Sequence, residues 1–299
     1  MNTYAVTNNK PSEVVSKRTV LRLHLVPELG ELRLDAIGPC EIEAYKAKKL
    51  VAGLSPKTIN NHLTVLRRML AVACEWGRLG FVPHVRWLRT PAPDFDFLTF
   101  EEAARLVSAA EAKWRPMILL ALRTGLRQGE LLALRWEDVD LVAGRLVVRR
   151  SAVRGIIGTP KSGKGREVPL SDDAVSILRP MPSRFRGELV FAKQDGTMLT
   201  AGDCKHPLRR ACRVAGIRQV SWHVLRHSFA SHLAMRGVAL KAVQELLGHS
   251  TMEMTMRYAH LSPDVRRDAV RLLDQPVSAP AADAPIVHQD TIGARSSGK

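Results

Sequence analysis

Cysteine and long apolar runs are both scarce in this chain of 299 residues. The cysteines form neither a C-x-x-C pair nor a His/Cys cluster with zinc spacing, so we expect free thiols in a reducing cytoplasm and no metal site. They are Cys40, Cys74, Cys204 and Cys212. No stretch approaches the roughly 18 apolar residues of a membrane span, and the N-terminus lacks the apolar core of a signal peptide. We therefore expect a cytoplasmic protein with no membrane partner.

Two common kinds of phosphate chemistry lack their sequence signatures here. There is no G-x-x-x-x-G-K-[ST] loop, which argues against a P-loop nucleotide hydrolase. Nucleases that use divalent metals normally bring several carboxylates together, and no such acidic cluster stands out in this sequence. We therefore expect an activity that needs no cofactor and no metal ion.

Acidic residues are outnumbered throughout the chain. The 45 Lys and Arg residues against 29 Asp and Glu give a net charge of +16, and the isoelectric point is about 10.3. This balance indicates an anionic partner, most simply double-stranded DNA, with a membrane surface as the weaker alternative. Ribosomal proteins and other basic proteins share such a composition, so charge alone does not decide the matter. The 45% hydrophobic content is enough for sizeable cores.

The sequence divides into two folded parts and a tail. Residues 12–52 have helical patterns in two pieces, with a break around Pro27 to Gly38, and residues 55–79 predict one long helix that begins at Ser55 and Pro56. A proline-rich linker then places a boundary near residue 93. We predict a helical bundle over 1–92, a second domain over 93–274 and a disordered tail over 275–299.

One face of the long helix is polar, cationic and short of acids. A surface that lies along DNA phosphates has this composition, so we predict DNA contacts there, although an ordinary solvated helix face has the same pattern. The residues are Lys57, Asn61, Thr64 and Arg68.

The second domain alternates helices with a few strands. Thr99 and Glu102 form a capping-box pattern that opens the first helix, and strands are predicted at 145–150 and 166–170. Ser250 and Glu253 form another such pattern, which predicts a short helix carrying Tyr258. The first helix is expected near 100–112, and the others near 114–123, 128–134, 171–178, 203–215, 223–236 and 239–247. The predicted fold class is therefore mainly α with a small antiparallel β-sheet.

Five polar motifs of this domain suggest phosphoryl chemistry. A tyrosine hydroxyl is a poor nucleophile alone, but beside fixed cations it can attack a phosphodiester and hold the phosphate covalently. Tyr258 lies 32 positions after Arg226 of His223-x-x-Arg226, and Arg127 precedes both. Each residue also has an ordinary structural explanation: Arg127 can pair with Glu130, a half-buried tyrosine is common, and a histidine often ends a helix. Packing does not require all of them in this order.

These motifs resemble the tyrosine recombinases of the phage integrase and Xer type. The resemblance spans residues 124 to 260, and more loosely the helix after Ser55 resembles the core-binding domain of that family. Gly129 stands where many relatives have serine. The matching segments are Thr124-Gly125-Leu126-Arg127 with Glu130, Pro160-Lys161 to Leu170, His223 to Ser231, Leu246 to Ser250, and Thr255 to His260.

The resemblance implies a reaction and a role for each residue. Tyr258 would attack the scissile phosphate and form a 3′-phosphotyrosyl link, while Arg127 and Arg226 would hold the non-bridging oxygens. Lys161 would protonate the leaving 5′-oxygen, with Lys164 as the rival candidate.

The histidines and the glutamate have less definite roles. His223 would accept the tyrosyl proton or contact the phosphate, His249 would donate another hydrogen bond to the phosphate, and Glu130 would orient an active-site cation or histidine.

At the level of the whole protein, the resemblance implies a C-shaped DNA clamp built from an N-terminal core-binding domain and a catalytic domain. It implies a homotetramer on two specific DNA sites, with a helix over 265–273 docking on a neighbouring protomer. Because few residues precede the first expected helix, we expect no additional arm-binding domain. The expected function is site-specific recombination for integration, excision or resolution of DNA elements. The alternatives are DNA relaxation of the type IB topoisomerase kind and a catalytically silent DNA-binding accessory protein.

Overall fold

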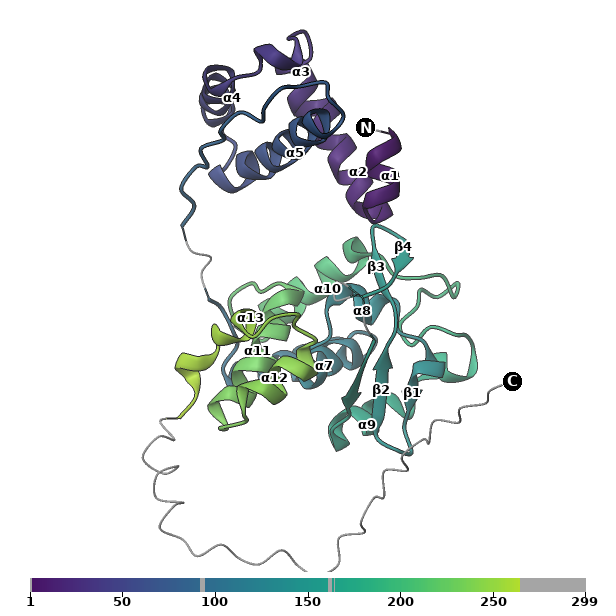
Figure 1. The fold of residues 1–299 in the computed structure, drawn as a ribbon. Helices are drawn as coiled ribbons and strands as arrows, with labels where there is room; N and C mark the ends of the chain where they lie inside the picture. Colours follow the sequence, from purple (N-terminus) through teal and green to yellow (C-terminus); the bar gives the residue numbers. More distant parts are fainter. Residues whose placement is uncertain (1, 92–94, 161–162, 164, 264–299) are drawn as a thin grey trace, which may run out of the picture.

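The computed structural model describes residues 2–91, 95–160, 163 and 165–263, and it forms a smaller N-terminal helical unit and a larger mixed unit (Figure 1). The predictions for Lys161, for Lys164, for the helix over 265–273 and for the tail over 275–299 lie outside these residues. The N-terminal unit consists of α1 (Asn2–Asn8), α2 (Pro11–Val20), a π-helical turn η1 (Leu21–Leu25), α3 (Val26–Leu29), a 3-10 turn η2 (Leu34–Ala36), α4 (Pro39–Val51) and α5 (Pro56–Glu75).

Helix α5 forms the centre of the N-terminal unit and confirms the predicted long helix. Ser55 caps it, because its Oγ accepts a hydrogen bond from the backbone N–H of Thr58 at 3.2 Å, and Pro56 occupies the first turn. The helix ends at Glu75, four residues before the predicted end. Its apolar face is fully buried and packs against η1 and α4. That face comprises Ile59, Leu63, Leu66 and Leu70.

The start of the chain was predicted wrongly. We expected the first helix near residue 12, but α1 already covers Asn2–Asn8. No hydrophobic period marks this short segment, and its position depends on a tertiary contact: the ring of Tyr4 meets the ring of Trp76 edge-on, with centroids 6.4 Å apart.

The mixed unit contains the predicted helices, with ends that differ by a few residues. The helices are α6 (Phe100–Ala109), α7 (Arg115–Thr124), α8 (Gln128–Leu132), α9 (Asp172–Leu178), α10 (Ala201–Val214), α11 (Trp222–Met235), α12 (Leu240–Leu247) and α13 (Glu253–Met256). The 3-10 turns are η3 (Trp136–Asp138), η4 (Pro182–Phe185) and η5 (Ala259–Leu261). The strands are β1 (Val139–Asp140), β2 (Arg145–Val148), β3 (Ser151–Val153), β4 (Ile156–Gly158) and β5 (Arg166–Pro169).

The strands form two small antiparallel sheets. One has the order β1-β2-β5, with Leu146 paired opposite Val168, and the other is the β3–β4 hairpin. The single strand predicted over 145–150 is therefore divided. At the division, Arg149 and Arg150 donate hydrogen bonds to the two carboxylate oxygens of Asp138, at 2.9 and 2.7 Å. The fold class, mainly helical with small antiparallel sheets, is confirmed.

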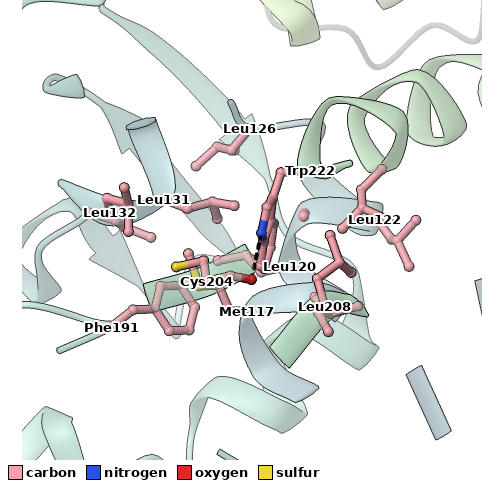
Figure 2. Packing of buried hydrophobic residues seen from close by; sticks show 14 of the residues in the cluster. Met117, Leu120, Leu122, Leu126, Leu131, Leu132, Phe191, Cys204, Leu208 and Trp222 are labelled. Atoms are coloured by element: carbon pink, nitrogen blue, oxygen red, sulfur yellow. Dashed lines mark hydrogen bonds between the residues drawn. The ribbon is translucent and has the colours of Figure 1, made fainter. Parts of the chain in front are cut away.

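The core of the mixed unit brings the later site residues together. Helix α7 is buried on nearly all sides and packs against α11 and α9. In Figure 2 the indole of Trp222, at the start of α11, lies among leucines of α7, α8 and α10 and donates a hydrogen bond of 3.2 Å to the carbonyl of Cys204. This packing holds the end of α7 beside the first turns of α11.

The two units are connected at two places. They are joined by the linker after α5, and α1–α2 also lie beside the β3–β4 hairpin (Figure 1). At that second contact the ammonium group of Lys10 donates to Thr159 and to the carbonyl of Pro160, at 3.1–3.2 Å. Among the helices of the described residues, none combines the length and the apolar character needed to cross a membrane.

Candidate active site

Arg127 lies at a sharp turn between two helices. Helix α7 ends at Thr124, and Gly125 then adopts a left-handed conformation, with φ of +62°. A Cβ atom at this glycine would lie 2.4 Å from a ring carbon of Phe229, so only glycine fits. Arg127 is the N-cap of α8, where its backbone N–H donates to the carboxylate of Glu130 at 3.0 Å. The turn thus aims the Arg127 side chain from a fixed position.

Glu130 connects two arginines beneath the site. Its side chain is fully buried and accepts hydrogen bonds from the guanidinium groups of Arg127, at 2.9 Å, and Arg166, at 3.1 and 2.7 Å. Burial by itself would raise the pKa of this carboxyl, but the hydrogen bonds and charges of Arg166 and Arg127 lower it below its ordinary value. The carboxylate is therefore ionised and orients both cations. The predicted role of Glu130 in orienting a cation fits this geometry.

Arg226 lies one turn inside α11 and is only 2% exposed. Its two terminal nitrogens donate to the carbonyls of Gly125, at 2.6 Å, and Leu247, at 2.7 Å. Burial, followed by the charge of Arg127, lowers the pKa of Arg226 to about 9, which still leaves the group charged at neutral pH. A second fixed cation therefore lies close to Arg127 and has two backbone oxygens as its partners.

His249 follows α12 at another left-handed glycine, Gly248. Its Nδ1 shares a hydrogen bond of 2.9 Å with the hydroxyl of Thr255, which fixes the ring. Burial, and then the positive charges of Arg226 and Arg127, lower the pKa of His249 to about 3. The imidazole is therefore neutral at physiological pH and can donate a hydrogen bond without adding charge.

Tyr258 is fully buried, and its hydroxyl shares a hydrogen bond of 2.7 Å with Nδ1 of His227. Burial raises the pKa of the phenol, while the charges of Arg226 and Arg257 lower it in part. The prediction of a short helix carrying Tyr258 was wrong in detail: α13 ends at Met256, and Tyr258 precedes the turn η5.

The predicted capping box before α13 is also wrong. Met252, in a helical conformation, occupies the N-cap position, and the hydroxyl of Ser250 instead contacts the sulfur of Met254 at 3.7 Å. The partly buried hydrogen bond between Thr255 and His249 holds this segment, and a local capping pattern does not reveal it.

His223 lies on the same helix as Arg226 and is exposed. Its ring meets the ring of His227 edge-on, with centroids 4.5 Å apart. The fold therefore brings Arg127, Arg226, His249 and Tyr258 into one neighbourhood, with His223 at its solvent side. Lys161 falls outside the described residues.

Two residues of this neighbourhood were not singled out from the sequence. Arg166 had appeared only within a matching segment, and its bonds to Glu130 and to the Leu246 carbonyl, the latter at 2.8 Å, link β5 to α8 and α12. His227 has a sequence signal, because it follows His223 by four residues and so lies on the same helix face. Among the described residues, no three His, Cys, Asp or Glu side chains converge as metal ligands would.

The four predicted DNA-contacting residues of α5 are all exposed, and the structure gives one of them further partners. Arg68 stacks over the ring of Tyr4, with 5.0 Å between guanidinium carbon and ring centroid, and pairs with Glu75 at 3.2 Å. Arg68 thus also holds α1 against α5. Lys57, Asn61 and Thr64 complete the exposed stripe.

The fold and the site together define a DNA strand-exchange enzyme of the tyrosine type. The fold has a small helical unit and a mixed unit with short sheets, and the site has a buried tyrosine near arginines and histidines. The chain belongs to the phage integrase family, whose sequence model matches residues 96–264. It is a tyrosine-type DNA recombinase that acts in site-specific recombination.

Individual relatives agree with this assignment. Tyrosine recombinase XerC of Xanthomonas campestris is 34% identical over 237 residues, which cover 74% of this chain and 70% of the relative. The integrase of Escherichia phage P2 is 29% identical over 239 residues, covering 77% of this chain and 63% of that integrase.

Solved structures share the fold across both units. The integrase of the Tn1549 transposon, in complex with a circular intermediate DNA, superposes with a TM-score of 0.78 at 23% identity and covers 91% of this chain and 96% of its own. A lambda integrase dimer bound to a core site superposes with a TM-score of 0.71 at 21% identity, covering 88% and 93%. These neighbours support the arrangement of the fold in two units.

Proposed function

We propose that this recombinase cleaves and rejoins specific DNA sites through a 3′-phosphotyrosine link to Tyr258. The observation that carries the proposal is the convergence of a buried tyrosine with Arg226, Arg127 and His249, which come from separate segments of the chain. In the reaction the phenolic oxygen bonds to phosphorus while the bond to the 5′-oxygen breaks. The link retains the bond energy, so a 5′-hydroxyl of a partner duplex rejoins the strand without ATP.

The two arginines act on the phosphate. Arg127 and Arg226 hold its non-bridging oxygens with planar forks that a lysine does not reproduce, and they stabilise the charge of the pentacoordinate transition state. Loss of either fork raises the barrier by about 3 kcal/mol, by analogy with other oxyanion donors. Glu130 and Arg166 keep Arg127 in place.

The remaining groups handle protons and hydrogen bonds. Lys161 protonates the leaving 5′-oxygen, with Lys164 as the alternative donor, because an ammonium releases a proton where a guanidinium does not. His249 donates to the phosphate, and His223 either contacts the phosphate or receives the tyrosyl proton.

The assembly that we propose is a homotetramer on two paired DNA sites, which exchanges strands in sequential pairs for integration, excision or resolution of an element. Residues 1–92 act as the core-binding domain and residues 93–274 as the catalytic domain. Within the first, Lys57, Asn61, Thr64 and Arg68 contact the DNA backbone. The substrate and the free thiols of Cys204 and Cys212 favour the cytoplasm.

Trapping a covalent adduct tests the nucleophile. A nicked duplex that carries the recombination site should yield an adduct with the native protein, and Tyr258→Phe should abolish the adduct while DNA binding stays near its native affinity. An adduct that persists in this variant would overturn the assignment. Sequencing the trapped DNA identifies the site.

A plasmid assay separates recombination from simple relaxation. Relaxation of supercoiled plasmids that lack the site, at catalytic amounts of protein, would favour an enzyme of the topoisomerase IB kind. We expect relaxation to depend on the site. A protein that binds the site but forms no adduct would be an accessory DNA-binding protein instead.

A further inference from the structure

The hydroxyl of Tyr258 has a specific partner, and that partner is not His223. Nδ1 of His227 lies 2.7 Å from the phenolic oxygen, within the range of a strong hydrogen bond. The two rings meet at a tilt, with centroids 5.9 Å apart. The ring of Phe95 contacts both of them edge-on, with its centroid 5.5 Å from that of Tyr258 and 5.9 Å from that of His227. The hydrogen bond is therefore sheltered from water on the side of the linker.

We propose that His227 is the general base of DNA cleavage. The inference rests on the proposed nucleophilic role of Tyr258. As the phenolic oxygen bonds to phosphorus, its proton moves to Nδ1 of His227, which becomes an imidazolium. The bond between phosphorus and the 5′-oxygen breaks, and that oxygen takes a proton from the general acid. In the rejoining step a 5′-hydroxyl attacks the phosphorus and gives its proton back to the general acid, the bond between phosphorus and the tyrosyl oxygen breaks, and the imidazolium returns its proton to that oxygen.

The surroundings of His227 keep it ready to accept a proton. Burial, and then the charges of His223, Arg257 and Arg226, lower its pKa to about 4, while Asp96 on the linker opposes them. The imidazole is thus neutral at physiological pH, and its Nδ1 is an acceptor in the tautomer that carries hydrogen on Nε2.

A base with so low a pKa needs help at the moment of transfer, and the substrate supplies it. The phosphodiester anion enters among the arginines and offsets the positive charge that disfavours a protonated His227. Because this compensation exists only when DNA is bound, the tyrosine is not activated in the free enzyme.

The neighbouring histidine lies on the solvent side of His227. His223 is exposed, and its ring lies edge-on to that of His227 at 4.5 Å between centroids. Both residues lie on α11, one turn apart, so the helix fixes their spacing. In this arrangement His227 receives the proton directly, and His223 lies between His227 and solvent or contacts the phosphate.

Single-turnover cleavage of the nicked duplex, measured from pH 5 to pH 10, tests the assignment. We expect His227→Gln to form the adduct about 100-fold more slowly than the native enzyme at neutral pH, the lower end of what a general base contributes. Its rate should rise steadily with pH, because hydroxide then removes the phenolic proton, whereas the native rate should level off. DNA affinity, measured in parallel, should change less than threefold.

A second substrate and a second variant distinguish the base from other roles. Replacing the 5′-bridging oxygen with sulfur removes the need for a general acid, so the slow cleavage of His227→Gln should persist on that substrate. A cleavage rate restored by the sulfur would mean that His227 serves the leaving group, and would overturn the proposal. His227→Asn, which is shorter, checks that the result does not depend on one replacement, and a thermal melt checks folding.

The controls also separate this inference from the proposed function. If Tyr258→Phe still forms the adduct, the nucleophile is another residue and both proposals fail. If Tyr258→Phe is inactive but His227→Gln keeps the native rate and pH profile, only the role of His227 is wrong. A pH profile altered in His223→Gln and not in His227→Gln would assign the base to His223.

Discussion

Arg166 donates two hydrogen bonds to Glu130, at 3.1 and 2.7 Å, across 36 residues of sequence. The same carboxylate accepts from Arg127, so one buried glutamate sets the position of a cation on strand β5 and of a cation at the start of α8. Because the carboxylate has no exposed surface, its charge has to be compensated by partners such as these two arginines. The Arg166–Glu130 pair thus connects strand β5 to the site, and the positions of both arginines depend on Glu130.

Glu130→Gln should therefore impair both stability and cleavage. Removing one charge of a buried ionic group leaves the arginines uncompensated, and we expect a loss of about 3 kcal/mol in the free energy of unfolding. Urea denaturation measures it, and the adduct assay should show a slower rate. The matched control is Glu167→Gln. Glu167 lies next to Arg166 on β5, and its half-exposed ion pair with Arg145, at 3.0 Å, contributes less than about 1 kcal/mol. Equal losses in the two variants would contradict the bridging role.

Gly125→Ala should disturb the turn that supports both arginines. The new Cβ atom would collide with Phe229, and the alanine would have to adopt φ of +62°. We therefore expect Gly125→Ala to lower the free energy of unfolding by about 2 kcal/mol more than the same substitution at a positive-φ glycine in open space. Gly53→Ala is that comparison, since Gly53 has φ of +79° and no atom within 4 Å. Chemical denaturation compares the two. Adduct formation should also slow in Gly125→Ala, because its carbonyl holds Arg226.

Acid should weaken the N-terminal unit through His62. This buried ring shares a hydrogen bond of 2.8 Å with the hydroxyl of Tyr45 and stacks on His24 at 4.2 Å. Burial, followed by the charge of His24, lowers its pKa from 6.5 to about 4. The folded state thus resists protonation, and stability that is complete above pH 6.5 is lost as the pH falls towards 4.

Between pH 7 and pH 5 this histidine should cost roughly 2 kcal/mol. Hydrogen-exchange mass spectrometry of the α4 and α5 peptides, corrected for intrinsic exchange, measures the opening free energy at each pH. His62→Gln should remove most of the difference, whereas replacement of the exposed His84 by glutamine should leave it intact. An acid response unchanged in His62→Gln would place its origin elsewhere.

DNA affinity should fall steeply with salt, and Lys57 should contribute to the slope. Lys57 is exposed on α5, and neutralising one phosphate contact lowers the slope of log affinity against log salt by about one. We expect this change in Lys57→Gln when binding is measured by fluorescence anisotropy over a salt series. Arg33→Gln is the control, because that guanidinium already pairs with Asp35 at 2.8 Å. If both variants keep the native slope, the stripe on α5 does not contact the phosphates.

Local chemistry made much of the secondary structure predictable. Ser55 and Thr99 begin helices as expected, because a side-chain oxygen satisfies a free backbone N–H whatever the tertiary context. The same rule failed at Ser250, where Met252 takes the N-cap position and Thr255 bonds to His249. The division of the strand at 149–150 was equally unpredictable, since it depends on Asp138.

The sequence by itself determined the fold class, the positive net charge that indicates an anionic partner, and the order of the polar motifs. Helical periods, charge and motif spacing are all properties of the linear chain. Only the tertiary structure decided which groups meet. It placed Arg166 on Glu130 and His227 on Tyr258, since these contacts depend on how α11 packs against α7 and α12, and on how α12 packs against β5. A tyrosine that the sequence marks as reactive is thus found buried against a particular histidine, a relationship that packing creates and that periodicity does not encode.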